Sequence, residues 1–246
     1  MLRVATYNVH DCVGRDGRYA PERIAAIIAD LRADIVALQE ITLDAQGAVV
    51  AALERLTRLR TIDGTLFARR GGRYGNIVMS RLPVLERCRL DLSIPGREPR
   101  GLLELQVAGI GGRAIRILAT HLGLGSDERA RQIEALARRV ATVSEPLILL
   151  GDFNVWQGPG KLRPLLRAGL QCTAVRTFPT WVRPVLALDR ILVRAPARIH
   201  ACWRAHVAAT AVASDHYPLV AEIAFDDLAG PVQTDANAPL AQAHPG

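Results

Sequence analysis

The sequence predicts one domain of mixed α and β structure, for three reasons. Its 246 residues suit one large domain or two small ones. Half of them are hydrophobic, which is enough for a sizeable core. Short runs rich in Val, Ile and Leu alternate with amphipathic helical patterns, and no linker divides the chain.

Ten segments are predicted as β-strands because they are rich in aliphatic residues and are bounded by Gly, Pro or Asp. They are residues 2–8, 34–40, 65–69, 76–81, 102–108, 113–121, 146–151, 188–193, 199–207 and 217–225. The Gly-rich stretch RRGGRYGN, residues 69–76, favours a hairpin turn before a strand over a phosphate-binding loop.

Helices are predicted where apolar residues recur on one face of a 3.6-residue period. Pro21 suits the first turn of one helix, Ser126 can cap another, and Gly169 suits the end of a shorter one. The predicted helices cover residues 21–32, around 45–59, 126–143 and around 160–168.

The end of the chain differs from the rest. Residues 226–246 are rich in Pro and Ala without periodicity, so we expect a disordered tail after a folded part of residues 1–225. No run approaches the length of a membrane span, and no signal-peptide pattern precedes the first strand. We therefore expect a cytoplasmic protein, and we expect it to be a monomer.

The formal net charge of +7 is compatible with a polyanionic partner. However, Lys161 is the only lysine, so the bias toward Arg is equally explained by coding composition. We take the charge as weak support for nucleic acid binding. The four cysteines form no C-x-x-C pair, which argues against a zinc knuckle or a redox pair.

Polar side chains stand at the ends of several apolar segments. For any one of them, an ordinary turn, cap or surface role is favoured by roughly two to one. Together they would crowd one end of a sheet with carboxylates, and that repulsion is tolerable only around a cation. The residues are Asn8, Glu40, His121, Asp152, Asn154, Asp189, Asp215 and His216.

The chemistry of this set indicates which cation. Carboxylate and amide oxygens are hard ligands and no thiolate belongs to the set, which favours Mg²⁺, with Mn²⁺ as a substitute, over zinc. Acids, a divalent cation and two histidines suit metal-assisted phosphoryl hydrolysis. The chain has no G-x-S-x-G, no P-loop and no H-E-x-x-H motif, which argues against the corresponding enzyme classes.

The motifs TYNVH, LQE, YGNIVMSR, THLG, GDFN, LDRILV and SDHYPLV occur in this order between residues 4 and 225. In this they resemble the endonuclease/exonuclease/phosphatase superfamily, the metal-dependent hydrolases typified by pancreatic deoxyribonuclease. The opening segment is most similar to small bacterial members. The resemblance implies an α+β fold: a four-layer sandwich of two mostly antiparallel sheets packed face to face, with helices outside.

The resemblance also implies roles for residues on the metal side of the site. Glu40 matches the principal Mg²⁺ ligand, Asn8 lies beside it, and Asp215 lies near the metal. Asp152 matches the carboxylate that orients or deprotonates the attacking water. Asn154 matches the amide that holds a phosphate oxygen.

A second group of matches concerns the substrate phosphate. His216 matches a histidine that faces the scissile phosphate, with Asp189 as its carboxylate partner. His121 matches a second phosphate-facing histidine, and Asn76 stands where its partner is expected. Arg100 matches an arginine near the substrate phosphate. The implied reaction is in-line attack by water on a phosphate ester.

Two positions depart from the branch of abasic-site endonucleases. His121 stands where that branch has tyrosine, and His10 stands where it has an acid. We therefore favour a phosphodiesterase or phosphatase that acts on a small or lipid-derived phosphate. A DNA or RNA nuclease, including a repair nuclease, is the alternative, and a binding protein that lost the chemistry is the least favoured class.

Some residues outside the motifs are weighed on their own. Trp203 is predicted in the core by roughly three to one, whereas core and pocket positions are evenly matched for Trp156 and Trp181. For Arg129 and Gln132, at the start of the helix after His121, a solvated helix face is slightly preferred.

Overall fold

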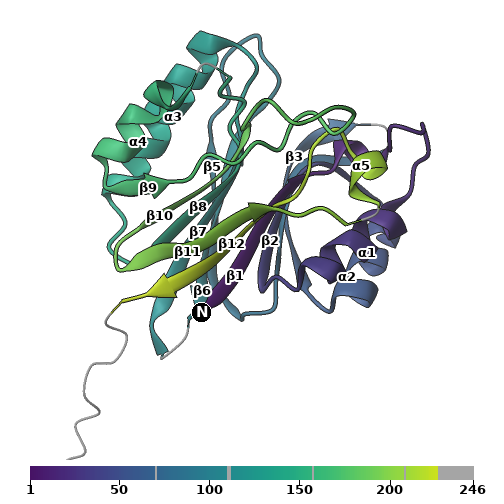
Figure 1. Cartoon of the computed structure of the whole chain (residues 1–246), viewed down its shortest axis with the longest axis horizontal. Helices are drawn as coiled ribbons and strands as arrows, with labels where there is room; N and C mark the ends of the chain where they lie inside the picture. The colour runs from purple at the N-terminus through teal and green to yellow at the C-terminus, as the bar shows by residue number, and fades with distance from the viewer. Residues whose placement is uncertain (70, 110–111, 157, 208, 227–246) are drawn as a thin grey trace, which may run out of the picture.

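The computed structural model describes residues 1–69, 71–109, 112–156, 158–207 and 209–226, in which the strands form two six-stranded sheets packed face to face (Figure 1). The first sheet has the order β11 (Ala197–Arg204), β12 (Leu219–Phe225), β1 (Leu2–Asn8), β2 (Ile35–Asp44), β4 (Gly72–Ser80), β3 (Arg60–Arg69). The second has the order β5 (Val84–Asp91), β6 (Gly101–Ala108), β7 (Ala114–His121), β8 (Leu147–Asp152), β10 (Asp189–Arg194), β9 (Leu170–Cys172).

Each sheet is antiparallel except for one parallel pair. These pairs are β1 with β2 in the first sheet and β7 with β8 in the second. A parallel pair needs a crossover connection, which α1 (Pro21–Leu31) and α3 (Ser126–Ala141) supply. The strands of each pair therefore end at the same edge of their sheet.

Helices cover the two outer faces and complete four layers (Figure 1). The helices α1, α2 (Ala48–Thr57) and α5 (Thr210–Ala213) lie outside the first sheet, where residues such as Ile24 and Leu53 are buried. The helix α3 and the short η3 (Pro159–Leu162) and α4 (Arg163–Arg167) lie outside the second, where Leu136 and Leu165 are buried. The predicted four-layer sandwich is confirmed.

A third apolar cluster fills the space between the sheets. Val4 and Ile35 of the first sheet meet Leu105, Ile117 and Ile148 of the second, and all five side chains are fully buried. Burying such side chains is worth about 1.5–3 kcal/mol each relative to leaving them exposed. This inner core fixes which face of every strand points inward, and hence where the polar residues at the strand ends lie.

The structure corrects the sequence predictions for one strand and for one tryptophan. The strand β5 was not predicted, because its residues are almost all exposed and its sequence, VLERCRLD, lacks an apolar run. As an edge strand, β5 is held by backbone pairing to β6 rather than by burial. The prediction that Trp203 lies in the core is wrong: its side chain on edge strand β11 is 36% exposed, with the Arg3 guanidinium 5.8 Å from the ring centroid.

The predicted tail, residues 226–246, lies outside the described residues except for Asp226, which pairs with Arg198 at 2.7 Å. Within the part of the chain that the structure describes, no helix is long and apolar enough to cross a membrane.

Candidate active site

Asp152, His121 and Asp189 lie side by side on the inner face of the second sheet. Each ends a row of alternate, apolar residues of its strand that face the other sheet. Ile148 and Leu150 belong to the inner core, and strand alternation places Asp152 on the same face. The register pairs Asp152 with His121 on β7 and with Asp189 on β10. The same apolar rows that form the core therefore set these three polar side chains side by side.

The first sheet contributes Asn8 and Glu40. Asn8 ends the inner-face row of β1, but strict alternation after Leu38 would turn Glu40 toward the outer helices. A β-bulge between Leu38 and Ile41, with Glu40 at a φ of 56°, re-aims the side chain. As a result, the Asn8 amide donates to Glu40 Oε1 at 2.9 Å and to Asp152 Oδ2 at 3.1 Å, which links the two sheets.

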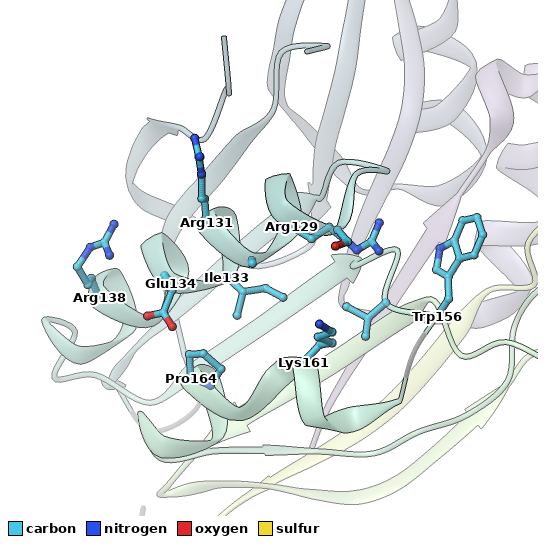
Figure 2. Close-up of a pocket in the computed structure, with 11 residues that line it drawn as sticks. Arg129, Arg131, Ile133, Glu134, Arg138, Trp156, Lys161 and Pro164 are labelled. Carbon is cyan, nitrogen blue, oxygen red and sulfur yellow. The ribbon is translucent and has the colours of Figure 1, made fainter. Parts of the chain in front are cut away.

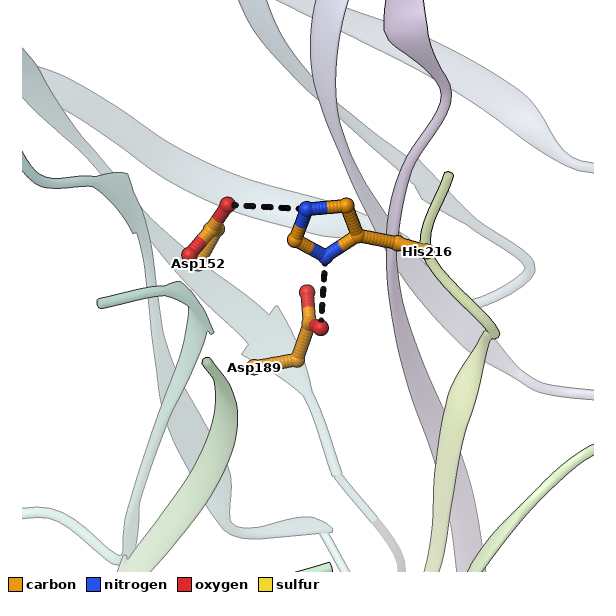
Figure 3. A group of neighbouring side chains, drawn as sticks. All are labelled: Asp152, Asp189 and His216. Atoms are coloured by element: carbon orange, nitrogen blue, oxygen red, sulfur yellow. Dashed lines mark hydrogen bonds and ion pairs between the residues drawn. The ribbon is translucent and has the colours of Figure 1, made fainter. Parts of the chain in front are cut away.

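His216 lies between two carboxylates (Figure 3). Its Nδ1 is 2.9 Å from Asp189 Oδ2, and its Nε2 is 3.8 Å from Asp152 Oδ2. The Thr177 hydroxyl donates to the same Asp189 oxygen at 2.5 Å. Thr177 was not predicted, because a threonine 12 positions before its partner carries no local signal. Asp189 is thus fixed from two sides, and it fixes the imidazole ring.

Burial and charge pull the His216 pKa in opposite directions. Burial alone would lower it, but the Asp189 and Asp152 carboxylates outweigh burial and raise the pKa of His216 to about 10. Burial raises the pKa of Asp152 to about 6, against the opposing effect of His216. At neutral pH, His216 is therefore a cation and Asp152 is mostly ionised.

His121 has the opposite protonation state. Burial, and then the positive charges of Arg100 and His216, lower its pKa well below the usual value. Arg100 Nη1 lies 3.2 Å from His121 Nδ1, and the Asn154 amide nitrogen lies 3.1 Å from Nε2. Both neighbours are donors, and a neutral ring accepts on one nitrogen only. The charged guanidinium makes the stronger bond, so we assign the acceptor to Nδ1 and the proton to Nε2. That Nε2 lies 3.6 Å from Asp152 Oδ2 and 3.9 Å from Glu40 Oε1, so a neutral histidine presents a donor to the site.

The partner predicted for His121 is corrected by these contacts. Asn76 is buried on β4, in the first sheet, and no hydrogen bond among the described residues joins it to His121. Instead, the ring nitrogens face Arg100 and the Asn154 amide. The Arg100 Nη1 atom that contacts the ring also lies 3.0 Å from Glu98 Oε1.

Asn154 closes the site behind β8. Its φ of 50° is a left-handed conformation that asparagine tolerates better than most residues. Its backbone N–H donates to Asp152 Oδ1 at 2.9 Å, and its side-chain amide donates to the Leu122 carbonyl at 2.9 Å. The turn therefore orients the Asp152 carboxylate and holds the loop that follows His121.

The loop before β12 is anchored to the first sheet. The Ser214 hydroxyl donates to the Asn8 carbonyl at 2.7 Å and accepts the His216 N–H at 3.1 Å. Asp215 Oδ1 lies 3.3 Å from His10 Nδ1, and this contact raises the pKa of His10. Ser214 begins the motif SDHYPLV, but the sequence predicted no role for it.

The site forms one cavity of about 420 Å³. Its lining also includes Tyr74, Leu124, Trp156 and Phe178, of which only Trp156 was considered from the sequence. The Phe178 ring lies 4.9 Å from that of His216 and 5.4 Å from that of Trp181, which is 49% exposed. The predicted residues that line the cavity are Glu40, Arg100, His121, Asp152, Asn154, Asp215 and His216.

The prediction of a solvated helix face for Arg129 and Gln132 is wrong. Both side chains are buried. Arg129 Nη1 donates to the carbonyls of Gly123 and Leu124. Gln132 accepts the Gly123 N–H at 2.9 Å and donates to the Leu92 carbonyl at 3.1 Å. The pair holds the loop that follows His121.

Replacing Gln132 by Leu is expected to lower the free energy of unfolding by about 1–3 kcal/mol, because it leaves a buried N–H and a buried carbonyl unpaired. Urea unfolding of the two proteins measures the difference. Glu134→Gln, on the exposed face of the same helix, serves as the control and should change little. Equal stability of Gln132→Leu and the control would show that the loop does not depend on these bonds.

Comparison with known proteins agrees with this geometry. Residues 5–216 match the model of the Endonuclease/Exonuclease/phosphatase family. The chain belongs to this family.

Among curated relatives of the family, YbhP of Escherichia coli, described as an uncharacterized protein, is 36% identical over 168 residues. The match covers 62% of this chain and 63% of YbhP, so the chain spans less than two thirds of that relative's length. A family member from Beutenbergia cavernae is 25% identical, with a TM-score of 0.73 over 91% of this chain and 71% of the other.

More distant solved structures share the fold alone. Mannosyl-6-phosphatase Bt3783 of Bacteroides thetaiotaomicron is 19% identical, with a TM-score of 0.73 over 92% of this chain and all of its own. D. rerio TDP2, complexed with a single-strand DNA product, is 18% identical, with a TM-score of 0.70 over 91% of this chain and 98% of its own. Family membership does not choose between such substrates.

Proposed function

We propose that this protein hydrolyses a phosphodiester by in-line attack of water, with Mg²⁺ as its cofactor and residues 1–225 as its catalytic domain. The observation that carries the proposal is a single cavity in which the buried Asp152 and the half-buried Glu40 and Asp215 meet one cationic and one neutral histidine. Opposite protonation states suit a site that must both stabilise phosphate charge and activate water.

The residues present fit a divalent cation. Four carboxylates gather around the site, from Glu40, Asp152, Asp189 and Asp215, and the cations His216 and Arg100 do not balance them. Asp152, Asp189 and His216 offer ligand atoms within 4.8 Å of one another. His216 is a cation at neutral pH and bonds to Asp189, so its ring is not available as a ligand, and we assign the ion to Glu40, with Asn8 and Asp215 nearby.

A hard cation such as Mg²⁺, or Mn²⁺ in its place, suits these oxygen ligands. When bound, it would neutralise charge on the phosphoryl oxygens.

Each side chain of the site has its own role in the proposed reaction. Asp152 orients the attacking water and accepts its proton, a task that suits a carboxylate whose pKa is raised to about 6. The neutral His121, through Nε2, and the Asn154 amide donate to phosphate oxygens. Cationic His216 stabilises negative charge, and Asp189 keeps it protonated.

Arg100 serves a positioning role in addition to the predicted one near the phosphate. By donating to Nδ1 of His121, it holds the tautomer that directs the other ring proton into the cavity. Asn76, in contrast, makes no such contact and is not proposed as a partner of His121.

A nuclease remains the alternative, and the structure bears on one form of it. At the position where abasic-site endonucleases have an acid, His10 pairs with Asp215. A histidine therefore stands in place of a second acidic metal ligand, which disfavours cleavage of abasic sites.

A substrate panel with Mg²⁺ tests the proposal: a chromogenic phosphodiester and monoester, phospholipids, inositol phosphates, RNA, and plasmid and abasic DNA. We expect hydrolysis of the small diester with a shallow dependence on salt. A duplex binder releases counterions, so its affinity falls steeply with salt. Cleavage of abasic duplex far faster than every small substrate, with a steep salt slope, would establish the nuclease instead.

A further inference from the structure

A second cavity of about 350 Å³ lies between α3 and the η3–α4 segment (Figure 2). The buried side chains of Ile133 and Val155 and the half-buried Pro164 line it, together with the exposed Ala130 of α3. Its size falls in the range of small-molecule sites. We call this cavity the α3–α4 groove.

The groove and the catalytic cavity share one lining side chain. Trp156 lines both cavities, is 56% exposed, and follows Asn154 by two positions. Figure 2 shows it at one end of the groove, with Arg138 at the other. A substrate whose phosphate lies against Asn154 can therefore extend past the indole into the groove.

The rim of the groove is basic. Arg131 and Arg138 project from exposed positions of α3, and Lys161 projects from η3, against one carboxylate, Glu134. Arg129 also lines the groove, but its Nη1 is bonded to backbone carbonyls. Within the described part of the chain, Arg131, Arg138 and Lys161 make no ion pair, and three cations to one acid attract an anion toward an apolar floor.

We propose that the α3–α4 groove binds an aliphatic chain, and that the substrate is an amphiphilic phosphate ester. The inference rests on the proposed function, whose substrate class it narrows. Ile133, Val155 and Pro164 offer a nucleobase no partner for its polar edge, and burying such groups unpaired costs free energy. An alkyl chain has no polar group, so its burial against the apolar floor breaks no hydrogen bonds. The basic rim complements the anionic groups of such a substrate.

Alkylphosphonates test the groove in the wild-type protein, because their C–P bond is not hydrolysed. Calorimetric titration with Mg²⁺ present compares ethylphosphonate with octylphosphonate, below the concentration at which micelles form. Each buried CH₂ group is worth roughly fourfold in affinity. Octylphosphonate is expected to bind at least about tenfold more tightly, even if only part of the chain is buried.

Ala130→Trp, at an exposed position, should fill the groove and remove this gain while leaving ethylphosphonate affinity unchanged. Ala141→Trp, at the exposed far end of the same helix, is the matched control and should retain the gain. Equal affinity of the two phosphonates for the wild-type protein, or a gain that survives in Ala130→Trp, overturns the inference. Chain-length preference without any hydrolysis would instead reject the proposed function and leave the groove as a binding site.

Discussion

Replacing Asp152 by Asn is expected to lower kcat on a phosphodiester by about 10²–10⁴-fold, because a general base of this kind contributes that much. The amide has nearly the same shape but cannot accept the proton of the attacking water. The single oxygen of the new amide can still accept the Asn154 backbone N–H, and only the bond from Asn8 is lost, so the fold should be retained.

Thermal unfolding separates lost chemistry from lost structure in this variant. Since burial raises the Asp152 pKa from 3.8 to about 6, this group lowers stability as pH rises from about 4 to 6, and the full cost is present at pH 8. Without metal at pH 8, Asp152→Asn should therefore melt at the same temperature as the wild-type protein or higher. Asp30→Asn, on an exposed position of α1, is the control. Wild-type turnover in Asp152→Asn would remove Asp152 from the mechanism.

Replacing His216 by Ala is expected to lower kcat by a similar factor, about 10²–10⁴-fold, since it removes a cation beside the phosphate. Its charge also predicts a pH dependence. The Asp189 and Asp152 carboxylates raise the pKa of His216 to about 10, so the cation persists below that pH and is lost above it.

Asp189→Asn removes one of the charges that hold this proton. The pKa of His216 should then fall toward its ordinary value of about 6.5, and the alkaline limb of the kcat profile should move to lower pH. Rate profiles of the two proteins from pH 6 to 10.5 measure the shift. An alkaline limb that stays in place after Asp189→Asn would show that another group sets it.

The sequence indicated that polar side chains at the ends of apolar segments would gather at one end of a sheet, and strand alternation is the physical reason for it in three cases. Asp152, His121 and Asp189 each end a row of aliphatic residues, and an apolar row has only one face on which to be buried. What the rows could not supply was the division of the strands into two sheets packed face to face, which came from the family resemblance and was then confirmed.

Contacts between distant segments were beyond sequence reasoning. Arg100 was placed near the phosphate, but its bond to His121 depends on how β6 and β7 pair. Glu40 reaches the site only through a β-bulge between Leu38 and Ile41, which the sequence did not indicate. Arg129 and Gln132 were misjudged because charged and amide side chains at a helix start are usually solvated, whereas here they hold a buried loop.

Restoration of activity by metal tests the central claim most directly. Wild-type protein and Asp152→Asn would be stripped of metal with a chelator and assayed on the chromogenic phosphodiester before and after addition of Mg²⁺ or Mn²⁺. We expect no hydrolysis by the stripped wild-type protein, full recovery with either ion, and a recovered rate about 10²–10⁴-fold lower in the variant. Undiminished hydrolysis by the wild-type protein in excess chelator would contradict it.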